Sequence, residues 1–276
     1  MRTVSNIPLR GKTALLMLVV FTVRFSAFSQ TQEPSYVMLT YIKTDRGKAS
    51  QYLEAIKKSS SKVWEARIKS GEIDFFSLYS VNKMRTNPED EYDYVAVMGS
   101  HSLQSMMDPA RTTREILKEM MPAMDDHTLE LTQSEIPSIR VVYKQEVCKL
   151  LDILNGDGTK FYEINYMRAA PGKANDYVSM EKNIFKPVHA ERKAKGEMTA
   201  WGFWQVVYPN SEKRDYDFIT ANGLNNWDKF VNSDYAAAYK KAFPAGDINK
   251  LSAQVSATRT MVKTEVWKRE LYIDGK

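Results

Sequence analysis

The sequence predicts an α+β protein made of two tandem copies of a βαββαβ unit. Three observations support this: an internal repeat, strand and helix patterns that recur in the same order in both copies, and turn signals between them. The chain has 276 residues, of which 43% are hydrophobic and 26% charged, with one cysteine. This composition excludes collagen, a coiled coil, a disulfide scaffold and a disordered chain.

The repeat is clearest near the start of each copy. Gly47-Lys48-Ala49 recurs 125 residues later as Gly172-Lys173-Ala174, and eleven of 41 aligned positions are identical between residues 41–81 and 166–206. Further along, Lys144-x-Glu146 matches Lys263-x-Glu265. The repeat therefore divides the chain into residues 36–150 and 161–272, with residues 151–160 as a linker.

Each copy is expected to contain the same six elements, and their order is ferredoxin-like. A first strand leads to a helix, which a glycine ends in the left-handed conformation, at Gly71 and Gly196. A hairpin, a second helix and a last strand follow. The expected ranges are strands 36–43, 73–81, 92–98 and 139–150 with helices 48–69 and from Leu103, and strands 161–168, 198–207, 216–222 and 261–272 with helices 173–195 and from Trp227.

A four-stranded sheet with both helices on one face leaves its other face in need of cover, so we expect the two copies to put their open faces together. In the first strands, the apolar positions are expected under the helices: Val37, Leu39, Tyr41, Tyr162, Ile164 and Tyr166. Glu163 and Asn165 would then point between the sheets, with Thr220 and Asn222 beside them. Polar groups there are costly unless they meet water, each other or a ligand.

Residues 1–29 have the pattern of a secretory signal peptide. Arg2, Arg10 and Lys12 precede an apolar run at 14–23, and Ala27-Phe28-Ser29 supplies small residues for cleavage. The run is about half as long as a membrane-spanning helix requires. We therefore expect a periplasmic or secreted protein that is not inserted in a membrane.

Charge and spacing exclude several partners and cofactors. Without residues 1–29 the chain carries 35 basic and 34 acidic residues, so no nucleic-acid surface is expected. His101, His127 and His189 are the only histidines and lack ligand spacing, so no metal site is expected. Cofactor motifs are also missing from the sequence, and no cofactor is expected. Cys148 has no cysteine with which to pair.

The repeat, the element order and the Gly-Glu step into an aromatic strand resemble the dimeric α/β barrels. In that superfamily two ferredoxin-like units put their open sheet faces together around a lumen. The segment Lys186-Pro187-Val188-His189-Ala190-Glu191-Arg192 and the stretch from Gly196 to Trp201 are similar to secreted bacterial members with tandem repeats. The resemblance implies an intramolecular barrel, and it brings no single activity with it.

The superfamily includes antibiotic-biosynthesis and haem-degrading monooxygenases, haem peroxidase-like enzymes and stress-responsive binding modules. Asn165 matches the first-strand asparagine of the haem-degrading type. The histidine that this type carries on its second helix is missing from residues 226–243, which argues against that activity.

His189 is the candidate catalytic residue, because the copies diverge there. Glu181, Phe185, His189 and Arg192 fall on one helical stripe, and Pro187 is expected to disturb the helix and present the ring differently. Two interpretations stay open: a core histidine satisfied by a backbone carbonyl or by Glu181, and a general acid/base or ligand donor. The site would lie in the second copy only, since His189, Glu163, Asn165 and Trp201 correspond to Trp64, Met38, Thr40 and Phe76.

Three functions remain open. The first is a module that binds a small, partly apolar ligand between the sheets, through Glu163, Asn165, Trp201, Thr220, Asn222 and Arg192. The second is a cofactor-independent monooxygenase or isomerase using His189, and the third is a structural pseudo-dimer with a filled lumen. Binding is favoured because the second copy is rich in aromatic residues. Further homo-oligomerisation also stays open.

The signal-peptide prediction can be tested by intact-mass analysis of protein from its own host. We expect the mature chain to begin at or near Gln30 and to fractionate with periplasmic or secreted material. An uncleaved chain in the membrane pellet would overturn this expectation.

Overall fold

The structure, a computed structural model, describes residues 35–85, 92–211 and 214–275. The expected signal peptide at 1–29 lies outside the described residues, as do residues 86–91 between the two strands of the first expected hairpin. Within the described ranges, none of the helices is both long enough and apolar enough to span a membrane.

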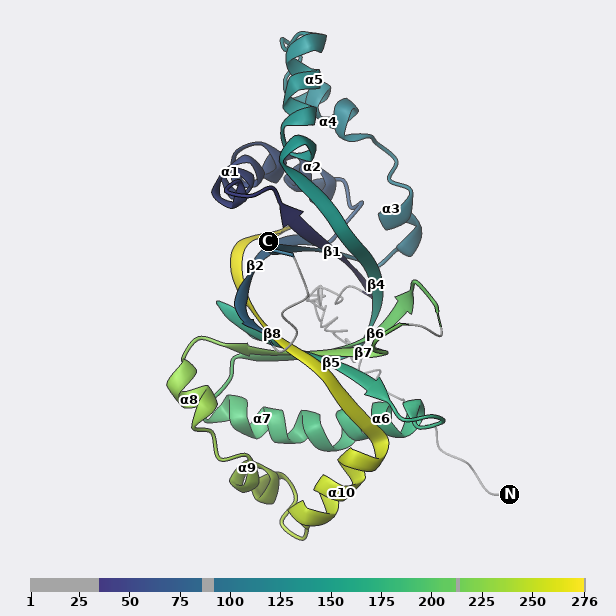
Figure 1. The fold of residues 1–276 in the computed structure, drawn as a ribbon, viewed down its shortest axis with the longest axis vertical. Helices are drawn as coiled ribbons and strands as arrows, with labels where there is room; N and C mark the ends of the chain where they lie inside the picture. The colour runs from purple at the N-terminus through teal and green to yellow at the C-terminus, as the bar shows by residue number, and fades with distance from the viewer. Residues whose placement is uncertain (1–34, 86–91, 212–213, 276) are drawn as a thin grey trace, which may run out of the picture. The chain divides into compact units, whose positions relative to one another are not determined.

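Eight antiparallel strands close into a barrel in the order β1-β3-β2-β8-β5-β7-β6-β4 (Figure 1). This is an α+β structure that matches the ferredoxin-like dimeric α/β barrel fold. The strands are β1 (Tyr36–Thr44), β2 (Phe75–Arg85), β3 (Tyr94–Ser100), β4 (Arg140–Leu154), β5 (Phe161–Ala169), β6 (Ala200–Tyr208), β7 (Phe218–Leu224) and β8 (Arg259–Asp274).

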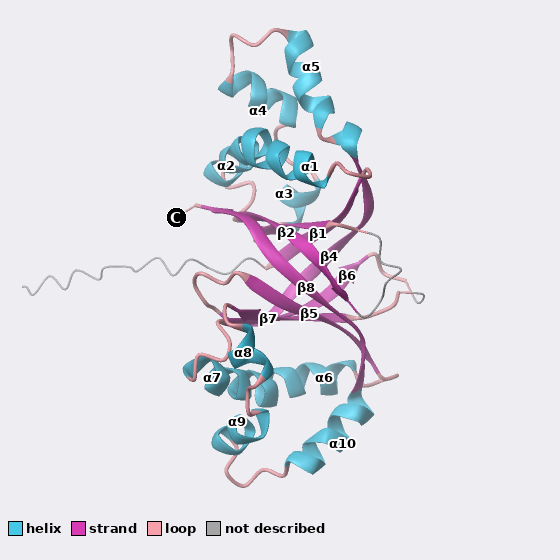
Figure 2. Cartoon of the chain, turned by 60° about the vertical axis from the view of Figure 1, so that its left-hand side comes forward, coloured by secondary structure: helices cyan, strands magenta, loops and turns pink. Residues whose placement is uncertain are grey.

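A helix interrupted by a π-helical turn covers the outer face of the sheet in each half of the barrel (Figure 2). In the N-terminal half it consists of α1 (Ala49–Ala55), the π-helical turn η1 (Ile56–Ser60) and α2 (Ser61–Lys69). In the C-terminal half it consists of α6 (Ala174–Met180), the π-helical turn η3 (Glu181–Phe185) and α7 (Lys186–Ala194). The expected glycine caps are confirmed, since Gly71 and Gly196 have φ of 75° and 70°.

The prediction of one second helix per copy is wrong, because three short helices stand in each place. Each begins at its own capping side chain, which accepts a bond from the first turn and so interrupts a longer helix: Ser102, Thr112, Asp125, Asn226, Asp234 and Asp247. The helices are α3 (Leu103–Met107), α4 (Thr113–Met120), α5 (Asp126–Glu135), with a 3₁₀ turn η2 (Pro137–Ile139), and α8 (Trp227–Val231), α9 (Tyr235–Ala242), α10 (Ile248–Thr258).

The two long strands join the halves. β4 pairs with β1 of its own half and with β6 of the other, while β8 pairs with β5 and with β2. β4 runs to Leu154, inside the segment 151–160 expected as a linker. Each half of the barrel is therefore hydrogen-bonded to the other along two seams.

The predicted orientation of the first strands is wrong. Leu39, Tyr41, Ile164 and Tyr166 lie in one buried cluster with Trp267 and residues of both halves, so this face points into the barrel. Both faces of each sheet are buried, one by the helices and one by the opposite sheet. Alternation in the sequence therefore separates the two faces without showing which is inside.

Two groups of polar side chains, here called the Tyr–Glu–Lys clusters, lie inside the barrel. In the first, Glu146 accepts hydrogen bonds from Tyr41 (3.0 Å) and Tyr216 (2.6 Å), and Lys144 donates to Tyr216 (2.6 Å) and contacts Glu146 (3.2 Å). The Glu146 carboxylate thus accepts a hydrogen bond from one tyrosine of each half of the chain, and the carboxylate of the second cluster does the same.

In the second cluster, Glu265 accepts bonds from Tyr166 (2.9 Å), Tyr92 and the Trp267 indole (2.9 Å), and Lys263 lies 3.1 Å away. The side chains of Glu265 and Lys263 are 0% and 6% exposed. A buried charge is tolerated when it is both paired and hydrogen-bonded, and this one is.

We predict that Glu265→Ala destabilises the protein by about 3–5 kcal/mol, because it removes the buried carboxylate that pairs with Lys263 and accepts hydrogen bonds from Tyr166 and Trp267. Urea denaturation followed by tryptophan fluorescence measures the change. The exposed Glu54→Ala variant is the control and should lie within about 0.5 kcal/mol of wild type. A loss below about 1 kcal/mol for Glu265→Ala would show that the cluster does not support the fold.

Candidate functional site

The candidate site lies between the C-terminal strands β5, β6, β7 and the covering helix α6–η3–α7, a space called here the C-terminal layer. Its apolar part is aromatic. Trp201 stacks on Phe203 with ring centroids 6.2 Å apart, and Phe203 stacks on Phe218 at 5.5 Å. Tyr177 of α6 meets Phe203 edge-on at 5.6 Å. The sheet thus offers the helix a continuous aromatic surface.

The polar residues predicted between the sheets lie in this layer instead, because they share a face with Met167 and Phe218 of its buried core. Glu163 accepts hydrogen bonds from the side-chain amides of Asn222 (2.8 Å) and Asn165 (3.2 Å). Thr264 donates to Asn165 Oδ1 at 2.9 Å. The location predicted for Glu163, Asn165 and Asn222 is therefore corrected, while their proximity is confirmed.

Thr220 and Trp201 occupy the same face of the sheet. Thr220 pairs with Asn165 on β5 and with Phe203 on β6, and Trp201 pairs with Asn222. Both are buried, with Trp201 1% exposed. The structure brings every predicted binding residue of the sheet into the C-terminal layer.

His189 projects from α7 into this layer. Its ring lies 5.7 Å from Trp201, 6.3 Å from Phe185 and 6.5 Å from Tyr235. Its Nδ1 is buried and has no hydrogen-bond partner among the described residues, so neither Glu181 nor a backbone carbonyl satisfies it. Burial, together with the nearby charge of Arg192, lowers the pKa of His189 to about 3. The imidazole is therefore neutral at physiological pH.

Arg192, one turn further along α7, is also buried. Its Nε lies 3.4 Å from Glu197 Oε2, and its Nη2 donates to Ser233 at 3.0 Å. The guanidinium also lies 5.9 Å from the centroid of the Tyr235 ring. Arg192 thus ties α7 to the segment leading into α9, and its ion pair with Glu197 is loose.

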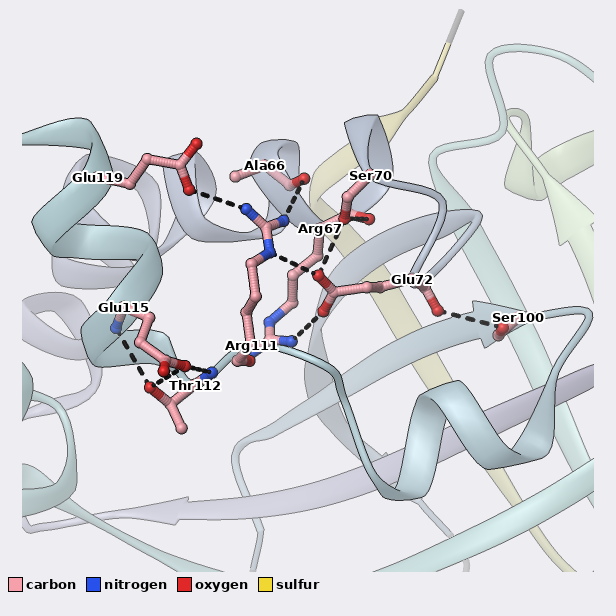
Figure 3. Close-up of polar contacts among 9 residues, drawn as sticks. All are labelled: Ala66, Arg67, Ser70, Glu72, Ser100, Arg111, Thr112, Glu115 and Glu119. Carbon is pink, nitrogen blue, oxygen red and sulfur yellow. Dashed lines mark hydrogen bonds and ion pairs between the residues drawn. The ribbon is translucent and has the colours of Figure 1, made fainter.

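The equivalent ion pair in the N-terminal half is shorter, and Figure 3 shows the contacts around it. Arg67 Nη1 lies 2.5 Å from Glu72 Oε2, and Arg111 Nε lies 3.0 Å from the other carboxylate oxygen. Ser70 donates to that same oxygen at 3.0 Å, and Arg111 also reaches Glu119. With the second arginine and the serine, both oxygens of the Glu72 carboxylate have charged or hydrogen-bonding partners, so this cluster stabilises the fold.

The irregularity of the covering helix is a π-helical turn, and it does not come from Pro187, contrary to the expectation. A π-helical turn lies before α2 as well as before α7, although residue 62, which corresponds to Pro187, is a lysine. Pro187 sits in the first turn of α7, where a missing N–H is tolerated. The π-helical turn is common to both halves, so it does not by itself distinguish His189.

Glu181 opens the π-helical turn, at the position where the N-terminal half has Ile56. It accepts a hydrogen bond of 2.6 Å from Tyr177 and is 3% exposed. Burial raises the pKa of Glu181 to about 7, against the opposing effects of Tyr177 and Arg259. A carboxyl group poised at this pKa can hold or release a proton near neutral pH.

Two residues of the layer were not predicted as part of the site. Tyr235, at the start of α9, packs 6.5 Å from Phe185 as well as from His189. Arg259, at the start of β8, acts electrostatically on Tyr177, Glu181 and Tyr235. The repeat pairs Arg259 with Arg140 and so carried no sign of function, while Tyr235 lies in a segment expected to be one continuous helix.

Buried polar atoms without a described partner concentrate in this layer. They include potential hydrogen-bond donors and acceptors on α7, on the strands β6, β7 and β8, and on α9: His189 Nδ1, Trp201 Nε1, Asn222 Oδ1, Arg259 Nε and Tyr235 OH. Buried polar groups in folded proteins are nearly always hydrogen-bonded. Several exceptions in one place are the feature by which a ligand site can be distinguished from an ordinary core.

Other features of the described chain lie apart from this layer. Its His, Cys, Asp and Glu side chains form no group of three placed to hold a metal ion. A surface hollow between α9 and α10 contains none of the predicted site residues; it is lined by Ala236, Tyr239, Lys240, Gly246, Asp247 and Ile248.

Comparison with known proteins supports the fold. No protein-family model and no curated protein matches the chain. Two similar solved structures, from Lactobacillus acidophilus and Fusobacterium nucleatum, are both described as putative monooxygenases. Each is 10% identical and covers 88% of this chain and 97% or 96% of its own, with TM-scores of 0.51 and 0.53. The resemblance to the dimeric α/β barrels is therefore confirmed as a likeness of fold.

The residues present do not fit a haem, a cofactor found in part of the superfamily. Tyr177 contacts Phe203 and Phe218 directly, at 5.6 and 5.2 Å, and His189 contacts Trp201 at 5.7 Å. Helix and sheet thus touch at both ends of the layer, and a porphyrin would have to displace the buried rings.

The pKa of Glu181 predicts a pH dependence of stability. Because it is raised from 4.5 to about 7 on folding, the unfolded chain releases its proton first as the pH rises, and stability falls across this range. We expect Glu181→Gln to gain about 3 kcal/mol relative to wild type between pH 4.5 and pH 7. Urea denaturation at several pH values measures it. Parallel profiles for both proteins would contradict the prediction; exposed Glu54→Gln is the control and should follow wild type.

Proposed function

We propose that the chain is an enzyme of the cofactor-independent monooxygenase or isomerase type, acting on a small, partly apolar molecule in the C-terminal layer. The carrying observation is the concentration of unpartnered buried polar atoms around His189, Trp201 and Tyr235. A purely structural layer would leave these atoms at a cost of about 1–3 kcal/mol each without compensation. The monooxygenase description of the two similar structures favours the enzyme over a passive binding module.

The acid–base role falls to Glu181 rather than to His189. A proton-transfer group works best when its pKa is near the operating pH, which suits Glu181 at about 7 and not His189 at about 3. His189 instead offers a neutral nitrogen that accepts a hydrogen bond from the substrate and orients it. Trp201 and Phe185 supply the apolar walls.

The substrate enters by displacing part of the cover. The unpartnered atoms are shielded from solvent, so they become available only when the segment carrying α8 and α9 moves from α7. Tyr235 belongs to this segment and is only partly buried. Closing the segment over a substrate would exclude water and strengthen each polar contact.

We also infer that the barrel is an internal duplication and that the protein is secreted or periplasmic. The halves 36–150 and 161–272 share their spacing, their π-helical turns and the Tyr–Glu–Lys clusters, and β1 to β4 repeat the strand arrangement of β5 to β8. The signal-peptide pattern of residues 1–29 supports export. Separately expressed halves should pair or aggregate, because each would expose an apolar sheet face.

The test of the site compares His189→Ala with Trp64→Ala, its counterpart in the N-terminal half. Trp64 stacks on Phe76 at 4.5 Å, so its truncation should cost about 3 kcal/mol of stability and leave bound small molecules in place. His189→Ala should instead abolish their retention with a smaller loss of stability. Native mass spectrometry of protein from its own host and thermal melting measure both. A His189→Ala variant that unfolds yet still retains ligand would identify a core histidine.

A further inference from the structure

The unpartnered atoms of the C-terminal layer are mostly hydrogen-bond donors. Arg192 Nε and Glu197 Oε2 already face each other at 3.4 Å. Of the remaining atoms, Arg259 Nε, Trp201 Nε1 and Tyr235 OH can donate, Asn222 Oδ1 accepts, and His189 Nδ1 can do either. A ligand that satisfies this group must therefore be rich in acceptors.

Arg259 supplies a positive charge to this group of donors. No hydrogen bond or ion pair from the described residues satisfies its buried Nε, although the guanidinium acts electrostatically on Tyr235 and Glu181. Glu181, Glu163 and Glu197 already place carboxyl groups in the layer, so a dianion such as a phosphate ester would be repelled. A monoanion with two oxygens matches one guanidinium and a neighbouring hydroxyl.

The rings around His189 define the other end of the ligand. The centroids of His189, Phe185 and Tyr235 lie 6.3 to 6.5 Å apart, and Trp201 lies 5.7 Å from His189. These rings are in contact with one another, so a planar ring enters among them only where Tyr235 shifts, and it then meets ring faces and edges. Larger ring systems would meet the packed Phe203 and Phe218.

We propose that the C-terminal layer takes a single-ring aromatic carboxylate, whose carboxylate is bound by Arg259 and the Tyr235 hydroxyl and whose ring lies against His189, Phe185 and Trp201. The inference rests on the proposed function, and it adds the charge and size of the ligand. Arg259 and Tyr235 determine specificity, because they are the groups that discriminate a carboxylate from an uncharged isostere.

The experiment titrates the full mature chain with benzoate and with benzamide, which has the same shape without the charge. The indole N–H resonance of Trp201 reports binding in the layer, and that of Trp267, bonded to Glu265 inside the barrel, is the internal reference. We expect benzoate to shift the Trp201 signal with at least about tenfold higher affinity than benzamide, and to leave the Trp267 signal in place.

Two variants and a matched control locate the charge. Arg259→Gln should remove the preference for benzoate without changing the affinity for benzamide. Tyr235→Phe should reduce the affinity for benzoate by about threefold to tenfold. Arg140→Gln is the control, because Arg140 holds the equivalent position in the N-terminal half and also has an unpartnered Nε; it should leave both affinities unchanged. If Arg259→Gln fails to fold, Tyr235→Phe decides alone.

The outcomes separate this inference from the proposed function. Equal affinity for benzoate and benzamide at Trp201 would leave the site standing and overturn the carboxylate. A shift at Trp267 alone, or a loss caused by Arg140→Gln, would place the ligand elsewhere and overturn the assignment to Arg259. Failure of both probes to shift Trp201 would count against the proposed function and this inference together.

Discussion

Two carboxylates inside the barrel, Glu146 and Glu265, are the constraint on which the rest of the structure depends. Each is hydrogen-bonded by tyrosines from both halves of the chain and paired with a lysine. Separating the halves would leave these charged groups with half of their partners, and the cost of burying them would no longer be offset. The clusters therefore favour one register of the two sheets over its alternatives.

Core side chains and the Tyr–Glu–Lys clusters occupy the interior of the barrel. The buried polar atoms without a described partner lie instead on the other face of the sheet, under the helices. In the N-terminal layer, which is the equivalent space between β1, β2, β3 and the covering helix α1–η1–α2, Trp64 stacks on Phe76 at 4.5 Å with an interplanar angle of 6°, and the Glu72 cluster is closed by Arg111. In the C-terminal layer the corresponding rings are His189 and Trp201, and the ion pair of Arg192 is loose. The two halves thus share one scaffold, but the N-terminal layer has a stacked aromatic pair and a tight ion-pair cluster where the C-terminal layer has a histidine and a longer ion pair.

The sequence was sufficient for the strands, for the first helix of each half and for the proximity of Glu163, Asn165, Asn222 and Trp201, because register follows from the alternation of strands. It was not sufficient for the second helix of each half, which capping side chains divide into three. Nor was it sufficient for the face on which these four residues lie. Tyrosine is compatible with either face of the sheet. Its position inside the barrel is decided by carboxylates far away in the sequence, since 105 positions separate Tyr41 from Glu146. Pairing at that distance leaves no local pattern, although the repeated Lys-x-Glu motif marked one side of it.

The pKa values of Glu181 and His189 determine the protonation states of these two side chains in the C-terminal layer. Burial raises the pKa of the carboxyl group and lowers that of the imidazole, because it penalises the charged form of each. At neutral pH the layer then holds a neutral histidine and a carboxyl group that is near half protonation, together with Arg259, whose buried Nε has no hydrogen-bond partner among the described residues. An anionic ligand restores the charge balance of this layer. The N-terminal layer has the equivalent arginine, Arg140, whose Nε also lacks a partner among the described residues, but it has an isoleucine at the position of Glu181 and a tryptophan at that of His189, so it carries neither the titrating carboxyl group nor the imidazole.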